Sequence, residues 1–210
     1  MVEKDTYNLI LASNSPRRRE LMNRFGMPFS CVSHKLEDES IADMEKKHEQ
    51  EIVVEIALNK LRSLYDDYRE NGVVIVSADT MVFFNGRALG KPADEEEAYR
   101  MLTAMSGEWH EVYTGCGIFI RAHDGKEHEI KFWEKTRVRF RKVPKQFIRQ
   151  YIAGGSPLDK AGAYGIQDEG AFMIEKIAGD YYNVMGLPIG RIWELFLDFE
   201  VLSSDFGQPD

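Results

Sequence analysis

A short segment near the start of the sequence combines two serine hydroxyls, a proline and three consecutive arginines. Pro16 suits the first turn of a helix, and the N-terminus of a helix presents unpaired backbone N–H groups. Together with the hydroxyls of Ser13 and Ser15 and the guanidinium groups of Arg17 and Arg18, these N–H groups would form an anion site suited to phosphates. Arginines that only face solvent there would be repelled by the helix dipole. We therefore predict an anionic ligand at this segment.

One carboxylate, Asp79, follows the most hydrophobic run of the chain. Residues 73–76 are consecutive valines and isoleucine, which is typical of a central strand covered on both faces. We expect Asp79 at the C-terminal end of this strand, where open α/β sheets place ligands. A carboxylate in that position is costly unless it is hydrogen-bonded, bound to a metal or used for proton transfer. The alternative is that Asp79 only caps a turn.

Two lysines and a run of acidic residues extend this set. Lys60 lies on or beside the apolar stripe of a helix predicted over residues 50–66, and Lys91 follows a predicted hairpin. The acidic run is Glu37, Asp38 and Glu39. Cations that hold phosphate oxygens, with carboxylates that hold a divalent metal or deprotonate water, suit polyphosphate chemistry. The sequence has no P-loop, no dinucleotide-binding loop, no zinc-protease motif and no nucleophile elbow.

The composition is that of an ordinary globular protein of 210 residues with a formal net charge of −8. This negative charge opposes non-specific binding of DNA or RNA, so we expect no nucleic-acid partner. Cys31 and Cys116 have no zinc-site or redox-motif spacing, which favours a reducing compartment. The five histidines show no ligand spacing and are predicted to be surface residues. No signal peptide or long apolar run is visible, so we expect a cytoplasmic protein with no membrane partner.

The remaining pattern alternates strands and helices, as in an α/β protein. Asn85-Gly86 indicates a hairpin turn, and Asp94 with Glu97 resembles a capping box at the start of a helix. Strands are predicted over residues 112–120 and 129–141, and helices from Pro144 and Pro188. The glycine-rich segment 153–170 is predicted to be a functional loop because it holds three polar residues: Asp159, Lys160 and Gln167.

Six motifs, in order along the chain, resemble the Maf family of nucleoside triphosphate pyrophosphatases. The resemblance runs from about residue 7 to residue 198. It implies a mixed, strongly curved central sheet flanked by helices, with two lobes and a deep cleft, as in Maf and ITPase-like proteins. It further implies one domain over residues 1–202 and a flexible tail over 203–210. The motifs are residues 11–18, 78–80, 90–92, 102–107, 159–167 and 179–188.

The resemblance also implies a reaction, in which a nucleoside triphosphate is hydrolysed to the monophosphate and pyrophosphate with a divalent cation, Mg²⁺ or Mn²⁺. Asp79 matches the proposed catalytic base, although the same carboxylate could instead hold the metal. Asp38 is the best match for a second metal carboxylate, and its neighbours Glu37 and Glu39 remain alternatives. The phosphate-binding set comprises Ser13, Ser15, Arg17, Arg18, Lys60 and Lys91.

Three residues follow the pattern of the dTTP/UTP-hydrolysing branch of the family: Arg17, Thr80 and Gln167. An amide and a hydroxyl can satisfy the hydrogen-bonding edge of uracil or thymine. We therefore predict dTTP and UTP as substrates, with modified pyrimidine nucleotides as an alternative. A rival hypothesis is a regulatory module that senses nucleotides in cell division or growth control without turnover. The sequence does not determine the oligomeric state, and a homodimer is one option.

Overall fold

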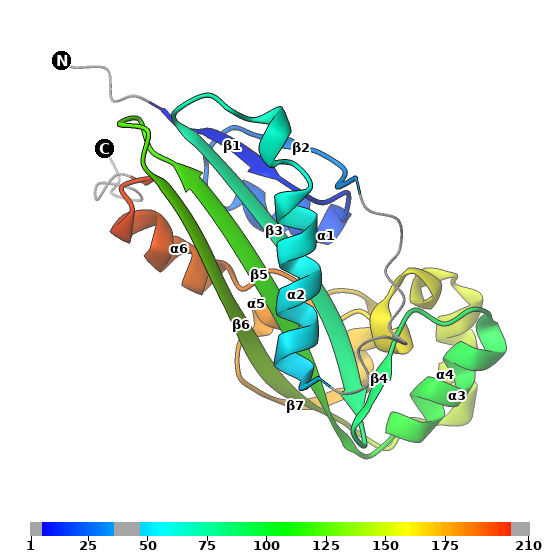
Figure 1. The fold of residues 1–210 in the computed structure, drawn as a ribbon. Helices are drawn as coiled ribbons and strands as arrows, with labels where there is room; N and C mark the ends of the chain where they lie inside the picture. The colour runs from blue at the N-terminus through cyan, green and yellow to red at the C-terminus, as the bar shows by residue number, and fades with distance from the viewer. Residues whose placement is uncertain (1–5, 36–46, 203–210) are drawn as a thin grey trace, which may run out of the picture.

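The fold is built on one long mixed sheet (Figure 1). The computed structural model describes residues 6–35 and 47–202. Its strands are β1 (Asn8–Leu11), β2 (Phe29–Cys31), β3 (Val73–Phe84), β4 (Arg87–Leu89), β5 (Trp109–Arg121), β6 (Glu127–Phe140) and β7 (Ile174–Ala178). The strand order is β2-β1-β3-β5-β6-β7, with β4 paired to β3. β1 is parallel to β2 and β3, whereas the other pairs are antiparallel. The predicted α/β class with a mixed sheet is confirmed.

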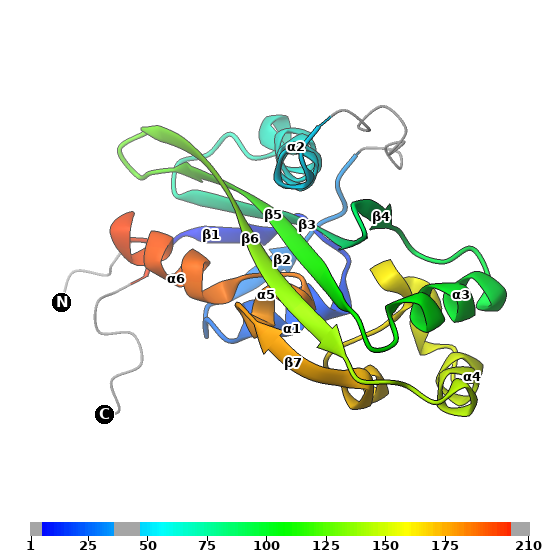
Figure 2. The same cartoon turned by 90° about the horizontal axis from the view of Figure 1, so that it is seen from below.

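Helices cover both faces of the sheet and one of its ends (Figure 2). On one face lies α2 (Glu49–Arg62). The other face is covered by α1 (Pro16–Asn23), α5 (Tyr181–Met185) and α6 (Ile189–Asp198). At one end of the long strands lie α3 (Glu95–Met105) and α4 (Lys145–Ala153), with the short 3-10 turns η3 (Ser156–Asp159), η4 (Ala161–Ala163) and η5 (Glu169–Met173). A further turn, η2 (Tyr65–Asp67), follows α2.

Strand β3 is buried on both faces, as its β-branched sequence predicts. Val74 and Val76 are fully buried in a cluster with side chains from α1 and α6. Val73 and Ile75 point to the opposite face and pack against α2. A separate cluster, which includes Phe140, joins the far ends of β5 and β6 to α3 and α4. The long strands therefore connect two hydrophobic cores.

The position of Asp79 differs from the sequence prediction. Asp79 lies inside β3, not at its end, because the strand continues to Phe84. Backbone pairing with β5 is unbroken through this region, and Asp79 stands opposite Gly115. The residues Ser77 to Thr80 look like a strand break because they are small or polar, but the long neighbouring strand keeps them extended. Asp79 therefore has a rigid backbone on both sides.

Helix α2 lies unusually close to the sheet at two points. A Cβ atom added to Gly115 would lie 2.2 Å from the backbone carbon of Val53, so only glycine fits there. One turn further along α2, the hydroxyl of Ser77 donates to the backbone oxygen of Ala57 at 2.7 Å. Backbone contact and a buried hydrogen bond thus fix the height of α2 above β3 and β5.

His110 corrects the prediction that the histidines lie on the surface. Its side chain is 1% exposed and packs edge-on against Phe140 and Tyr164. The ring Nε2 and the Tyr164 hydroxyl are 2.7 Å apart. Burial lowers the pKa of His110 to about 4, so the ring is neutral at physiological pH. Its neighbours Trp109 and Glu111 are only partly buried, because alternate residues of β5 face away from this core.

Other local predictions hold. Helix α1 begins at Pro16 with Ser15 as its N-cap, and α3 begins after Asp94, whose carboxylate accepts from the Glu97 backbone at 2.7 Å. Both cysteines are free thiols. Among the described residues, no helix is long and apolar enough to span a membrane. The predicted tail, residues 203–210, lies outside the described residues.

Candidate active site

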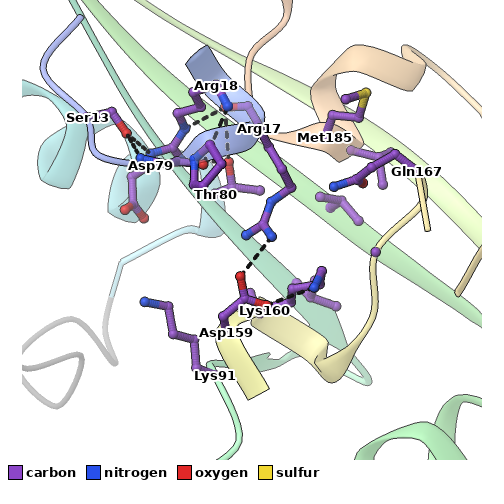
Figure 3. Close-up of a pocket in the computed structure, with 18 of the residues that line it drawn as sticks. Ser13, Arg17, Arg18, Asp79, Thr80, Lys91, Asp159, Lys160, Gln167 and Met185 are labelled. Atoms are coloured by element: carbon purple, nitrogen blue, oxygen red, sulfur yellow. Dashed lines mark hydrogen bonds and ion pairs between the residues drawn. The ribbon is translucent and has the colours of Figure 1, made fainter. Parts of the chain in front are cut away.

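One pocket of about 410 Å³ gathers every described residue that the sequence placed in the site (Figure 3). It opens between α1, the middle of β3 and the loop that precedes β7. Segments far apart in the sequence therefore meet at one place, as the predicted cleft requires. The candidate residues that line the pocket are Ser13, Ser15, Arg17, Arg18, Lys60, Asp79, Thr80, Lys91 and Gln167.

An ion pair between Asp79 and Lys60 lies on the α2 side of the pocket. Asp79 Oδ1 and Lys60 Nζ are 2.6 Å apart, and each side chain is 18% exposed. Lys60 stands one turn beyond the Ala57 carbonyl that binds Ser77, so the close packing of α2 sets its distance from Asp79. Charge compensation makes the partial burial of this carboxylate tolerable. The ion pair engages Oδ1, and Asp79 is among the residues that line the pocket.

The N-terminus of α1 is held in place by Arg18 and the two serines. Ser13 Oγ accepts from the Ser15 backbone at 3.2 Å and from Arg18 Nη1 at 3.4 Å. Arg18 also donates from Nε to the Gly186 carbonyl at 2.8 Å and from Nη2 to Thr80 Oγ1 at 3.1 Å. Burial lowers the pKa of the Arg18 guanidinium, and the nearby negative charge of Asp79 opposes that shift. Arg18 therefore links α1 to β3 and to the turn after α5.

Arg17 points across the pocket towards the loop on the opposite side. Its Nη1 lies 3.1 Å from Asp159 Oδ2, and Figure 3 shows this pair bridging the two walls. Burial would raise the pKa of Asp159, but its contacts with Lys160 and Arg17 hold that pKa below its ordinary value. Asp159 is 63% exposed, so water screens the pair and an entering anion can compete for Arg17.

Lys91 and Gln167 are the exposed members of the set. Lys91 follows β4 and reaches towards the pocket from the side of Asp159, as Figure 3 shows. Gln167 lies in the loop between η4 and η5, so its amide is accessible to a ligand. Thr80 differs, because its hydroxyl already contacts Arg18 and lies 2.9 Å from Thr114 Oγ1.

The sequence recognised the loop over residues 153–170 but assigned no site role to Asp159 or Lys160. Both line the pocket. Lys160 is 8% exposed and lies 2.8 Å from Asp159 Oδ1 and 3.4 Å from Asp168 Oδ2. The available signal was a lysine between two acidic residues in a glycine-rich loop. Such a lysine is ordinarily a solvated surface residue, so only the packing of the loop distinguishes it.

Carboxylates of the pocket are the candidate ligands for a metal ion. Within residues 6–35 and 47–202, no cluster of three or more histidine, cysteine or acidic side chains is arranged to hold a metal ion. Mg²⁺ commonly takes one or two carboxylates and completes its shell with water and substrate phosphates. The carboxylate of Asp79, in a pocket lined by several cations, fits that pattern. Asp38, Glu37 and Glu39 lie outside the described residues.

The fold and the pocket together define a class of protein: an α/β protein whose pocket is lined by several cationic side chains and by the carboxylates of Asp79 and Asp159. The family model described as "Maf-like protein" matches residues 8–199. This chain belongs to the Maf family. The resemblance noted in the sequence is thereby confirmed.

Relatives of similar length carry one name, dTTP/UTP pyrophosphatase. The relative from Thermococcus gammatolerans is 48% identical, and the match covers 93% of this chain and 99% of that protein. The relative from Thermosipho melanesiensis is 42% identical, with 93% and 100% covered. Among solved structures, a HAM1 protein from Coxiella burnetii is 15% identical over 66% of this chain and 75% of that one, with a TM-score of 0.39. That structural likeness is too weak to bear on function.

Proposed function

We propose that this protein is a nucleoside triphosphate pyrophosphatase that hydrolyses dTTP and UTP to the monophosphate and pyrophosphate. The observation that carries the proposal is the gathering of Arg17, Lys60 and Lys91 around Asp79 in one pocket. Several cations around the carboxylate of Asp79 suit a polyphosphate and a hydrolytic water. The relatives named dTTP/UTP pyrophosphatase support the same substrates, because they match nearly the whole chain.

In this mechanism water attacks the α-phosphorus of the bound nucleotide. Asp79 Oδ2 accepts the proton of that water, while Oδ1 stays paired with Lys60 at 2.6 Å. The bond from the α-phosphorus to the bridging oxygen breaks, and pyrophosphate leaves. Arg17 and Lys91 neutralise the negative charge that develops on the phosphate oxygens.

A divalent cation, Mg²⁺ or Mn²⁺, belongs to the proposal. Phosphate oxygens and a carboxylate of the 37–39 run would hold it, and Asp79 would join them where it serves as a metal ligand instead of as the base. Such an ion supplies charge neutralisation and lowers the pKa of a bound water. Hard oxygen ligands favour these ions over zinc or copper. Activity that survives exhaustive chelation would remove the metal from the mechanism.

We assign the selection of the nucleobase to the loop that carries Gln167. The Gln167 amide is exposed at the pocket and can both donate to a carbonyl oxygen and accept from a ring N–H. Thr80 contributes less directly, because its hydroxyl is engaged by Arg18 and Thr114. A site that hydrogen-bonds a base rejects bases that leave its polar groups unpaired.

A panel of nucleoside triphosphates, assayed with Mg²⁺ or Mn²⁺, tests the proposal. We expect pyrophosphate release from dTTP and UTP, with purine triphosphates hydrolysed at least about tenfold less efficiently in kcat/KM. Release of orthophosphate instead of pyrophosphate would contradict attack at the α-phosphorus. Tight nucleotide binding with no turnover would favour the sensing module.

A further inference from the structure

A continuous series of polar contacts joins helix α1 to the loop that carries Gln167. Arg17 Nη1 lies 3.1 Å from Asp159 Oδ2, and Asp159 Oδ1 lies 2.8 Å from Lys160 Nζ. Lys160 Nζ lies 3.4 Å from Asp168 Oδ2. Lys160 is thus the central member of the series, between one carboxylate at the pocket and another inside the loop.

Lys160 differs from the other lysines of the pocket in its surroundings. Lys160 is 8% exposed and has two carboxylates beside it. By comparison, Lys91 is exposed, and Lys60 is paired with the carboxylate of Asp79. Two carboxylates compensate the charge of Lys160, as a buried ammonium requires. Two neighbouring carboxylates offset the positive charge that would otherwise attract a phosphate. The position of Lys160 therefore suits a structural role within the site.

The loop is folded tightly around Lys160 and Asp168. Asp168 Oδ1 accepts from the Gly170 backbone at 2.8 Å and from the Tyr151 hydroxyl at 3.1 Å. The Gly165 backbone donates to the same tyrosine hydroxyl at 3.1 Å. A Cβ atom at Gly165 would lie 2.3 Å from Asp168 Oδ2 and 2.9 Å from Lys160 Cε, so the backbone passes directly over this ion pair. Gln167 is part of the turn that these contacts close.

We propose that Lys160 is a positioning residue for base selection: by holding Asp168 it fixes the turn that presents Gln167 to the pyrimidine. The inference rests on the proposed function for the identity of the substrates. The role of Lys160 in holding the loop does not depend on that function. Lys160 acts through the loop and makes no contact with phosphate. Its loss should therefore change which base is preferred more than it changes the handling of triphosphate.

The activity test compares UTP with CTP, which differ only at the base edge that an amide can distinguish. Lys160→Met keeps the apolar stem and removes the charge. We expect it to lower the ratio of kcat/KM for UTP to that for CTP by about tenfold or more, and Lys160→Arg to restore part of the ratio. The control Lys91→Ala should lower both values and keep the ratio. If Lys160→Met left the ratio unchanged, with or without an equal loss for both nucleotides, the proposal would be overturned.

Hydrogen–deuterium exchange of the nucleotide-free protein tests the structural part without any substrate. Lys160→Met should accelerate exchange of the backbone amides of Gly165 and Gly170, and unchanged exchange would overturn the proposal. Asp168→Asn is the second variant, because it retains the acceptor for Gly170 and removes only the charge; it carries both measurements if Lys160→Met does not fold. If the unmodified protein shows no preference for UTP over CTP, the proposed function is wrong, and the exchange data still decide the role of Lys160.

Discussion

Asp79 and Lys60 form the pair on which the proposed chemistry depends. Asp79 lines the pocket, and one of its oxygens lies 2.6 Å from the ammonium group of Lys60. Asp79 could be singled out from the sequence, because a carboxylate next to a buried hydrophobic run is costly without a function. Lys60 is singled out by its match to the Maf family. Their direct contact could not be predicted, since it depends on how closely α2 packs on the sheet.

Asp79→Asn should reduce turnover by about a hundredfold or more, since an amide can neither accept the proton of water nor provide an anionic metal ligand. The substitution is nearly isosteric, so the circular dichroism spectrum should not change. Steady-state assays with UTP, at a protein concentration corrected for the folded fraction, measure the effect. Near-normal turnover by the folded variant would exclude Asp79 from the mechanism.

Lys91→Ala should lower kcat/KM by about thirtyfold, which corresponds to about 2 kcal/mol for a charge-assisted contact. The loss should be the same for dTTP and UTP, because phosphates are common to both. Lys131→Ala, which removes an exposed lysine of β6 outside this pocket, is the matched control and should have little effect. A loss confined to one nucleotide would indicate that Lys91 recognises the nucleobase instead of the phosphates.

Arg18 shows what residue types alone could not reveal. The sequence predicts a phosphate-binding cation there, and the residue does line the pocket. Its guanidinium also holds the Gly186 carbonyl and the Thr80 hydroxyl. Those partners lie far along the chain from α1, so no local pattern indicates them. Arg18 thus has a structural task in addition to any contact with phosphate.

At the scale of elements, the helices and hairpins could be predicted because each has a local signal. Ser15 and Pro16 mark the start of α1, and Asp94 marks that of α3. The length of β3 could not be predicted, because its polar middle is kept extended by backbone pairing with β5. Strand pairing between distant segments is not encoded in local propensity.

Gly115→Ala tests how α2 is placed. Its new methyl group would lie 2.2 Å from the Val53 backbone, which cannot give way as a flexible side chain would. We expect a loss of about 1–3 kcal/mol in the free energy of unfolding, together with about a tenfold or greater loss of kcat/KM as Lys60 moves from Asp79.

Urea denaturation and UTP assays measure the two effects of Gly115→Ala. Gly190→Ala in α6 is the control, because an added methyl group there meets nothing within 4 Å. If Gly115→Ala retained full stability and activity, close packing of α2 would not be what positions Lys60.

For the molecule as a whole, the pocket lies beside strands shared by two hydrophobic cores. One core joins β3 to α1 and α6, and the other joins β5 and β6 to α3 and α4. The mixed sheet and the cleft could be anticipated from the resemblance to the Maf family. His110, inside the second core, could not, because the charged residues Glu108 and Glu111 close to it in the sequence suggested a surface position.

His110 should make stability depend on pH. Its pKa is about 4 in the folded protein because burial disfavours the charged ring, against about 6.5 in an unfolded chain. The unfolded state therefore binds more protons between these values, and stability is lost as pH falls from 6.5 towards 4. The loss should approach about 3 kcal/mol near pH 4.

Urea denaturation of the protein and of His110→Gln, at intervals between pH 7 and pH 4, measures this contribution. The glutamine amide can still hydrogen-bond the Tyr164 hydroxyl, but it does not titrate. The slope in this window should become smaller in the variant. A slope unchanged by His110→Gln would assign the pH dependence to other groups.

The contact between Arg17 and Asp159 makes a carboxylate of the protein compete with bound anions for Arg17. An anion that binds Arg17 Nη1 in place of Asp159 must displace a carboxylate of the same chain, and the exposed pair contributes at most about 1 kcal/mol, or about fivefold in affinity. For a ligand that contacts only Arg17, the free energy needed to displace Asp159 directly weakens binding. For a triphosphate that contacts several cations, its other contacts offset this free energy. Short anions are thereby disfavoured relative to long ones, which in the proposed reaction would favour release of pyrophosphate over release of the triphosphate.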